Sequence, residues 1–205
     1  MAVSICGIPP LIETYKDASF FPIPPSRDSI ESVDMVLHIP VAIDFFYDYL
    51  KNRHNPDGIH AFALYIDLRL YDGLCQNEES SRDEIILMAQ KIKQEYLDED
   101  GDYYVELEQA MRTSFIEKYA VVENLMVNTS EIDYKTQEPR TASEDGEHHN
   151  LDLIFIEVYA FVLQKLRGYF DLFKRSQAFT ELENEIRKKE RLYEILIDSN
   201  LISNQ

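Results

Sequence analysis

Histidines and carboxylates are the side chains of this sequence that could carry chemistry, and two clusters of them stand out. His148 and His149 follow Glu147 and could bind a metal weakly, but neighbouring histidines in a loop seldom form the tetrahedral site that zinc prefers. The run Asp98–Asp102 (DEDGD) is similar to a calcium loop. Aligning Gly101 with the invariant glycine of such loops places Tyr96 and Leu107 where oxygen ligands are required. The sequence therefore predicts no metal site, and a surface turn at 98–102.

Nucleotide-binding and nucleophile motifs are also missing from the sequence. It contains no Walker loop, dinucleotide fingerprint, nucleophile elbow or helix with paired zinc-binding histidines. Carboxylates are abundant, but their spacing singles out no acid–base pair. We therefore expect a binding module without a catalytic residue and without a cofactor.

The balance of charges bears on the partners. With 20 basic and 38 acidic residues the formal net charge is −18, which disfavours nucleic acid and anionic membrane surfaces. The charge either keeps the chain soluble or favours a partner with a basic face. Two cysteines, Cys6 and Cys75, are too few for a disulfide framework. The mildly apolar start Met1–Ile8 lacks the basic residues of a signal peptide. No apolar run in the sequence is long enough to span a membrane. We expect a cytoplasmic protein without membrane insertion; its oligomeric state stays open.

The elements that must position these residues are expected to be helices. Only 6 of the 205 residues are glycine, and apolar residues make up 45%, which favours a packed all-α fold. Five of the eight prolines lie in residues 1–28, so this segment cannot be one helix and is expected to be an irregular arm. Residues 29–185 are expected to form a single bundle of about nine helices, with an acidic loop at 129–150. A C-terminal helical extension is expected at 186–205.

Apolar spacing and capping residues set the expected helix ends. Helical spacing starts at Ser29 and stops at Pro40, and a second stripe runs from Ile43 to Leu50. Asn55 and Pro56 are typical of a helix start, and that helix is expected to stop at Gly73. The sequence Ser81–Glu84 (SRDE) fits a capping box, and a further helix is expected from Glu106 to about Val122.

The segment Leu151–Leu163 is the most apolar stretch of the chain. Eleven of its thirteen residues are apolar, which predicts a helix buried on nearly all sides or, as the rival interpretation, a buried strand. On the helical interpretation, Ile156→Asp should be costly because it would bury an unpaired charge.

Several of these segments resemble the regulator of G-protein signalling (RGS) homology domain. Val41–Tyr71 (VAIDFFYDYLKNRHNPDGIHAFALYIDLRLY) resembles the third and fourth helices of that family, and Ala89–Leu97 (AQKIKQEYL) its fifth. Val105-Glu106-Leu107 stands where the family has a Val-Asn-Leu-like tripeptide. Val158–Asn184 (VYAFVLQKLRGYFDLFKRSQAFTELEN) looks like the closing helices. The resemblance covers roughly residues 30–185 and implies an all-α, RGS-like domain that takes part in G-protein signalling.

The resemblance also implies where a partner would bind. Active members of the family clamp the switch segments of a Gα subunit, which performs GTP hydrolysis with its own residues. Their clamping asparagine corresponds to Glu106, their Glu-Asn pair to Asp57 and Gly58, and their closing Asp and Arg to Gly168 and Leu172. Asn55, Tyr104 and Tyr169 are the nearest side chains from which another clamp could be built.

These departures change the expected activity. An ionised Glu106 can only accept hydrogen bonds, Gly58 has no side chain, and Leu172 cannot pair with a carboxylate. We therefore expect a domain that binds a Gα subunit or another signalling protein without ordinary GTPase activation. At most it would be a GTPase-activating regulator. The alternative is a structural or assembly protein of helical-bundle type with no link to G proteins.

Overall fold

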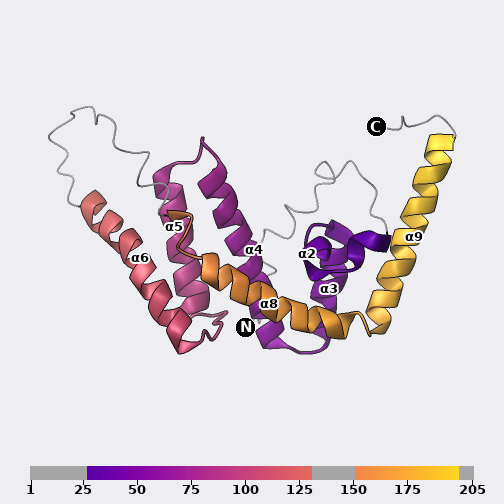
Figure 1. Cartoon of the computed structure of the whole chain (residues 1–205), viewed down its shortest axis with the longest axis horizontal. Coiled ribbons are helices and arrows are strands. Elements are labelled where there is room, and N and C mark those ends of the chain that lie inside the picture. The colour runs from indigo at the N-terminus through magenta and orange to yellow at the C-terminus, as the bar shows by residue number, and fades with distance from the viewer. Residues whose placement is uncertain (1–26, 131–150, 199–205) are drawn as a thin grey trace, which may run out of the picture. The chain divides into compact units, whose positions relative to one another are not determined.

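The computed structural model of the chain describes residues 27–130 and 151–198 (Figure 1). These residues form seven α-helices, one 3-10 turn and one π-helical turn, and none of them forms a strand. The all-α class is thus confirmed, whereas the expected count of about nine helices stays a prediction for the whole chain. The arm up to residue 26, residues 131–150 of the acidic loop with the His148–His149 pair, and residues 199–205 lie outside the described residues.

The chain divides into two compact units. Among the described residues, unit 1 combines residues 27–59 with residues 164–198, and unit 2 contains residues 60–130 and 151–163. The boundary falls inside two helices, α4 (Pro56–Gln76) and α8 (Ile156–Phe173). The domain boundaries expected at 28/29 and 185/186 both fall inside elements, namely η2 (Arg27–Ile30) and α9 (Gln177–Asp198).

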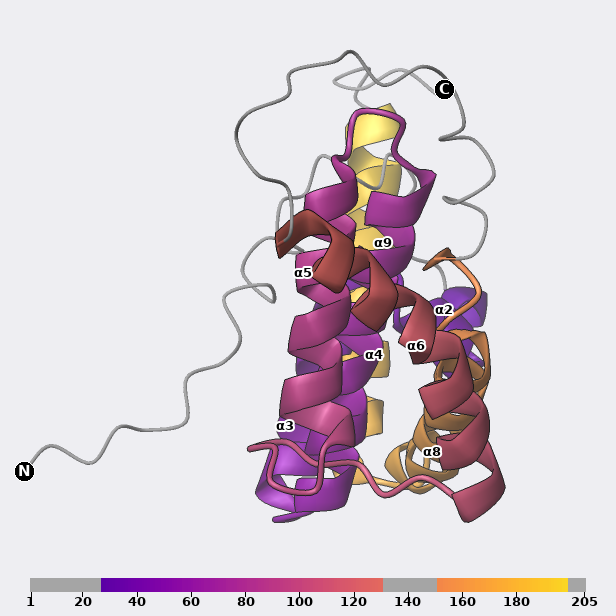
Figure 2. The same cartoon turned by 90° about the vertical axis from the view of Figure 1, so that its left-hand side faces the viewer.

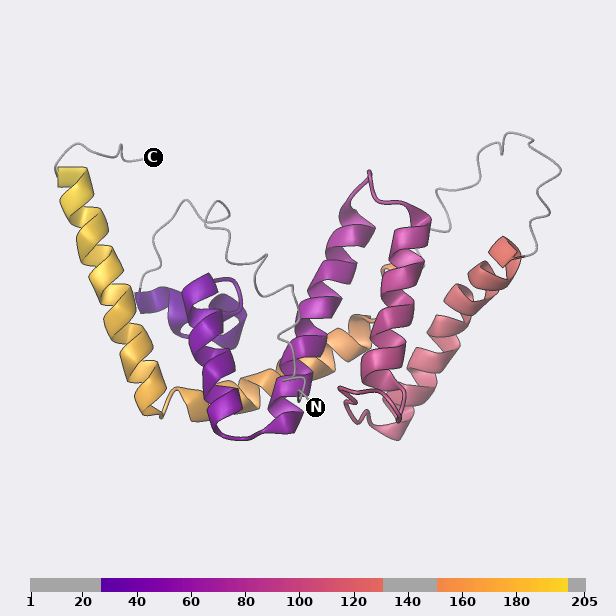
Figure 3. The ribbon, with the colours of Figure 1, turned by 180° about the vertical axis from the view of Figure 1, so that it is seen from behind.

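Unit 1 is built from η2, α2 (Val33–Val36), α3 (Pro40–Asn52), the start of α4, the end of α8, and α9. Both η2 and α3 pack against α9 (Figure 3). Helix α3 begins with Pro40, whose missing N–H is not needed in the first turn. The apolar residues Ile30, Val33 and Val36 before Pro40 are buried, as their spacing predicts, but the segment forms η2 and the short α2 rather than one continuous helix.

The core of unit 1 is a cluster of aromatic rings. Phe46 of α3 packs against Phe170 and Phe173 of α8, with ring centroids 5.8 and 5.3 Å apart. Phe173 also lies 5.3 Å from Phe179 of α9 and 5.2 Å from Tyr49. Because Phe170 and Phe173 share the buried face of α8, the opposite face of this helix is left to solvent.

Unit 2 contains the rest of α4, α5 (Arg82–Ile92), η3 (Lys93–Leu97), α6 (Gln109–Ser130) and the residues from Leu151 to Leu163. Helices α4 and α5 run antiparallel side by side (Figure 2). The capping box at the start of α5 is confirmed: the Ser81 hydroxyl accepts from Glu84 N, and the Glu84 carboxylate accepts from Ser81 N. Phe155 joins the elements of this core, since its ring lies 5.6 Å from Phe115 of α6 and 4.9 Å from Tyr71 of α4.

Three predicted helix ends were wrong. Helix α4 continues past Gly73 to Gln76, because an internal glycine costs a helix only about 1 kcal/mol and does not break it. Helix α6 starts at Gln109 rather than at Glu106, and it ends at Ser130 rather than at about Val122, so the first two residues of the expected loop at 129–150 are helical. The residues before it have no regular secondary structure; Val105 and Leu107 are buried, and Glu106 between them is exposed.

The prediction of a helix buried on all sides at Leu151–Leu163 was also wrong. Residues 152–155 form a turn, and α8 begins only at Ile156. Leu151, Ile154 and Phe155 are buried, but Leu153 and Ile156 are 50% and 55% exposed. Ile156→Asp would therefore place its charge in water and should cost little. Among the described helices, none is both long and apolar enough to cross a membrane.

Candidate functional site

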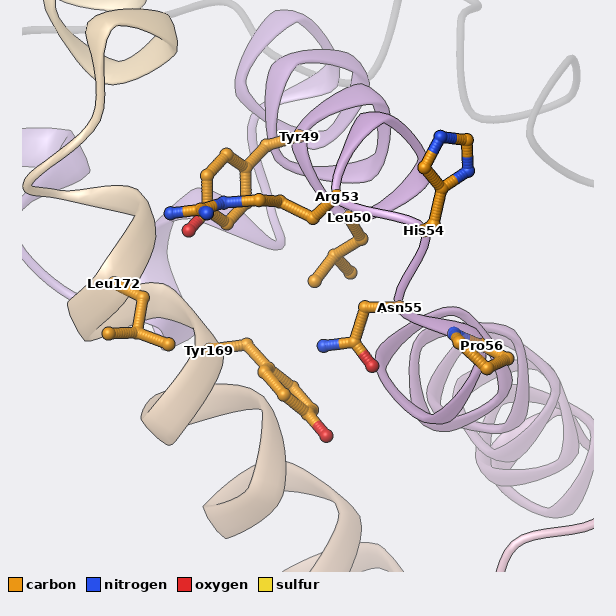
Figure 4. A pocket seen from close by; sticks show the side chains of 8 residues that line it. All are labelled: Tyr49, Leu50, Arg53, His54, Asn55, Pro56, Tyr169 and Leu172. Carbon is orange, nitrogen blue, oxygen red and sulfur yellow. The ribbon is translucent and has the colours of Figure 1, made fainter.

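The clearest candidate site in unit 1 is a hollow beside the loop between α3 and α4, which we call the α3–α4 hollow (Figure 4). Its volume is about 370 Å³. It is lined by the end of α3 and the following loop (Tyr49, Leu50, Arg53, His54, Asn55 and Pro56) and by Tyr169 and Leu172 of α8. Three of the residues expected to bind a partner, Asn55, Tyr169 and Leu172, thus line one hollow.

The loop beside the hollow has a defined backbone geometry. His54 adopts a left-handed conformation with φ 49°, which reverses the chain at the end of α3. Its N–H donates to Lys51 O (3.0 Å), and Asn55 N donates to Leu50 O (3.3 Å). These two bonds form a Schellman motif with histidine at the position usually held by glycine. The motif fixes where Asn55 leaves the helix.

Asn55 connects this loop to the start of α4. Its Oδ1 accepts a hydrogen bond from Gly58 N (3.0 Å), which confirms the predicted helix cap. Its amide nitrogen is consequently directed into the hollow (Figure 4). Arg53 supplies further donors at the rim, where its guanidinium lies 5.5 Å from the centroid of the Tyr49 ring. The hollow therefore offers hydrogen-bond donors beside the apolar Leu50 and Leu172.

Asp57 is held by residues of α8. Lys165 Nζ lies 2.6 Å from Asp57 Oδ1, and the Tyr169 hydroxyl donates a hydrogen bond to Asp57 Oδ2. Burial raises the pKa of Tyr169 to about 12, and the hydrogen bond to Asp57 adds to the shift. Tyr169 therefore keeps its proton at neutral pH. The Asp57 contacts fix the start of α4 against α8 within unit 1.

Gly58 and Gly168 occupy different environments. Gly58 is buried, and a Cβ atom there would lie 2.9 Å from Leu50 Cδ2 and 3.1 Å from Asn55 Nδ2. It thus serves close packing beneath the loop rather than direct contact with a partner. Gly168 is exposed, and a Cβ there would meet nothing within 4 Å. Leu172 is 51% exposed at the rim, where a partner could cover it.

Tyr104 and Glu106 belong to unit 2. The Tyr104 carbonyl accepts a hydrogen bond from His60 Nδ1 (3.1 Å), and Val105 N donates to Tyr96 O (2.7 Å). These bonds hold the segment in which the exposed Glu106 stands between the buried Val105 and Leu107. The structure thus presents Glu106 at the surface, in the segment between η3 and α6.

Unit 2 also contains a charged cluster whose carboxylate is buried. Asp67 of α4 is 1% exposed, and its Oδ2 accepts from Lys91 Nζ and from the Tyr96 hydroxyl, both at 2.8 Å. The contacts join α4, α5 and η3, so this cluster acts in the fold. Among the described residues no group of three or more His, Cys, Asp or Glu is placed to hold a metal ion.

Sequence reasoning missed part of the α3–α4 hollow. Tyr49, Leu50, Arg53 and His54 were not among the expected site residues, although they directly precede Asn55. The adjacent Arg53 and His54, at the end of a helix in a strongly acidic chain, were the available signal. Comparison with known proteins adds no assignment: no family model matches the chain, and no curated protein sequence matches it.

Proposed function

We propose that this chain is an RGS-like, all-α module that binds a Gα subunit or another signalling protein and does not itself accelerate GTP hydrolysis. One observation carries the proposal. The resemblance indicates Asn55, Tyr169 and Leu172 as partner-binding residues, and all three line the same hollow although Asn55 lies far from the other two in the sequence. A hollow with donors and a half-exposed leucine suits a protein partner that inserts one or two side chains.

The expected lack of GTPase activation follows from Glu106. An exposed carboxylate replaces the asparagine that would donate to the switch segments of Gα, and it cannot donate while ionised. Loss of one hydrogen bond of this kind in a transition state slows a reaction by roughly 10²–10³. Gly58, packed against Leu50 and Asn55, has no side chain that could restore the contact.

Binding to Gα loaded with GDP and aluminium fluoride tests the proposal, and single-turnover GTP hydrolysis tests the lack of activation. Leu172→Asp should abolish binding, because it places a charge at the rim of the hollow. The matched control is Leu87→Asp on α5, which is 63% exposed against 51% for Leu172 and lies outside the hollow. The control should bind like the parent.

Two results would overturn the proposal. If Leu172→Asp bound as well as Leu87→Asp, the α3–α4 hollow would not be the binding surface. If no Gα subunit bound in any nucleotide state, the link to G proteins would fall and a structural bundle would be favoured. Clear acceleration of GTP hydrolysis by the unmodified chain would contradict the argument from Glu106.

A further inference from the structure

Unit 2 contains a second hollow, which we call the α4 pocket, between the last turns of α4 and the residues around the start of α8. Its volume is about 370 Å³. The buried side chains of Leu68, Tyr71 and Phe155 line its interior, and Leu153 and Ile156 line it with 50% and 55% of their surface exposed. Exposed apolar side chains beside a preformed apolar hollow are typical of a docking surface.

The interior of the α4 pocket is held in place by the fold. The Tyr71 hydroxyl donates to Leu151 O (2.6 Å), and the Tyr71 and Phe155 rings meet edge to face, 4.9 Å between centroids. These contacts tie the end of α4 to the turn that precedes α8. A ligand therefore finds the pocket already formed and need not order it on binding.

Among the residues that the structure describes, the charged side chains that line the pocket are both acidic. They are Asp72 and Asp152, both exposed, and no described lysine, arginine or histidine joins them. Gln76 Nε2 donates to Asp72 Oδ1 (3.0 Å), which orients that carboxylate beside the hollow. The chain as a whole carries −18, so the surrounding field reinforces the local charge. The complementary ligand combines an apolar group with positive charge.

We propose that the α4 pocket binds a segment of another protein that inserts an apolar side chain between Tyr71 and Ile156 and sets lysine or arginine residues against Asp72 and Asp152. A second copy of this acidic chain would bring like charges to the rim, which disfavours self-association there. The pocket belongs to unit 2 and the α3–α4 hollow to unit 1, so this proposal does not rest on the proposed function.

A fluorescent helical peptide with leucines at every third or fourth position and lysines elsewhere is the probe. One control peptide replaces lysine by glutamate, and another replaces leucine by serine. Measured by anisotropy at physiological salt, both controls should bind at least about tenfold more weakly than the probe. If the serine peptide bound as tightly as the probe, the affinity would reflect only the attraction of its lysines to the net negative charge of the chain, and the proposal would be overturned.

Variants locate the binding. Ile156→Ser should weaken the probe about tenfold, whereas Ile116→Ser on α6, 58% exposed against 55% for Ile156, should not. Asp72→Asn combined with Asp152→Asn should weaken it more than Glu108→Gln combined with Glu117→Gln, which changes the net charge equally at exposed positions outside the pocket. Equal effects within either pair would overturn the proposal.

Cys75 gives a readout that needs no change in the pocket. It lines the α4 pocket and is half-buried. In a Cys6→Ser background it is the single thiol, since the sequence has two cysteines. The probe should slow its alkylation by iodoacetamide, and the control peptides should not. An alkylation rate of Cys75 that saturating probe leaves unchanged would overturn the proposal. Dimerisation of the chain that Ile156→Ser abolishes would overturn it as well, because a second copy and not a basic partner would then occupy the pocket.

Discussion

Removing Lys91 should destabilise unit 2 far more than an ordinary surface lysine would. Lys91 Nζ lies 2.8 Å from Asp67 Oδ2, and the Asp67 side chain is 1% exposed. Among the described residues, Asp67 Oδ1 has no hydrogen-bond partner and is buried. In Lys91→Met the Tyr96 hydroxyl alone would be left to compensate the carboxylate.

The magnitude follows from burial. Removing one partner of a fully buried ion pair costs about 3–5 kcal/mol, whereas an exposed pair is worth about 0–1 kcal/mol. The Lys91 side chain is 36% exposed, so water can enter where its ammonium group was. We therefore expect Lys91→Met to lower the free energy of unfolding by about 2–3 kcal/mol, below the fully buried value.

Lys118→Met is the matched control. Lys118 Nζ lies 2.7 Å from Glu157 Oε1, and the lysine is 34% exposed, but its carboxylate partner is 48% exposed. The two pairs thus differ mainly in the burial of the acid. Lys118→Met should cost less than about 1 kcal/mol. The double variant Asp67→Leu/Lys91→Met should be more stable than Lys91→Met, because it no longer buries a lone carboxylate.

Urea unfolding followed by far-ultraviolet circular dichroism measures these differences, and hydrogen exchange of the α4 and α5 amides assigns them to unit 2. Equal losses in Lys91→Met and Lys118→Met would refute the reasoning, since burial of the carboxylate would then carry no cost. A double variant less stable than Lys91→Met would refute it as well.

Four further predictions concern single positions in the loops and helices. His54→Gly should raise the free energy of unfolding by about 1 kcal/mol in urea, because glycine adopts the left-handed conformation without strain. Gly168→Ala should raise the free energy of unfolding by about 0.5–1 kcal/mol, because alanine is the better helix former and its Cβ would meet no other atom within 4 Å. Gly58→Ala should bring no such increase, because its Cβ would lie 2.9 Å from Leu50 Cδ2. A higher melting temperature for Gly58→Ala would contradict this close packing. Ser81→Ala should lower the free energy of unfolding by about 1 kcal/mol, through loss of the helix cap. Hydrogen bonds from Ser81 lower the pKa of Glu84 below its ordinary value of 4.5. The Glu84 carboxylate therefore stabilises the folded chain above pH 4.5, and this stabilisation is lost as the pH falls through the pKa of Glu84 in the folded state. The stability difference between the parent and Glu84→Gln should accordingly vanish in acid; a difference independent of pH would be the contrary result.

Local signals in the sequence determined that the chain is helical and where two of its helices, α4 and α5, begin. Asn55 followed by Pro56 fixes the start of α4, and Ser81 with Glu84 fixes the start of α5, because caps act on backbone groups within three residues. Apolar spacing likewise predicts the buried stripe from Ile43 to Leu50, since one face of a helix must be buried, and both of these residues lie in the core. Such features need no knowledge of the rest of the chain.

Only the tertiary structure decided which apolar residues stay exposed and which distant residues meet. The composition of Leu151–Leu163 could not reveal that Leu153 and Ile156 face solvent, because an apolar run carries no record of where its neighbours lie. Asp57 and Tyr169 are 112 positions apart, and they join only because α8 packs beside the start of α4 within unit 1. The α3–α4 hollow and the α4 pocket arise in the same way, from side chains that no local pattern connects.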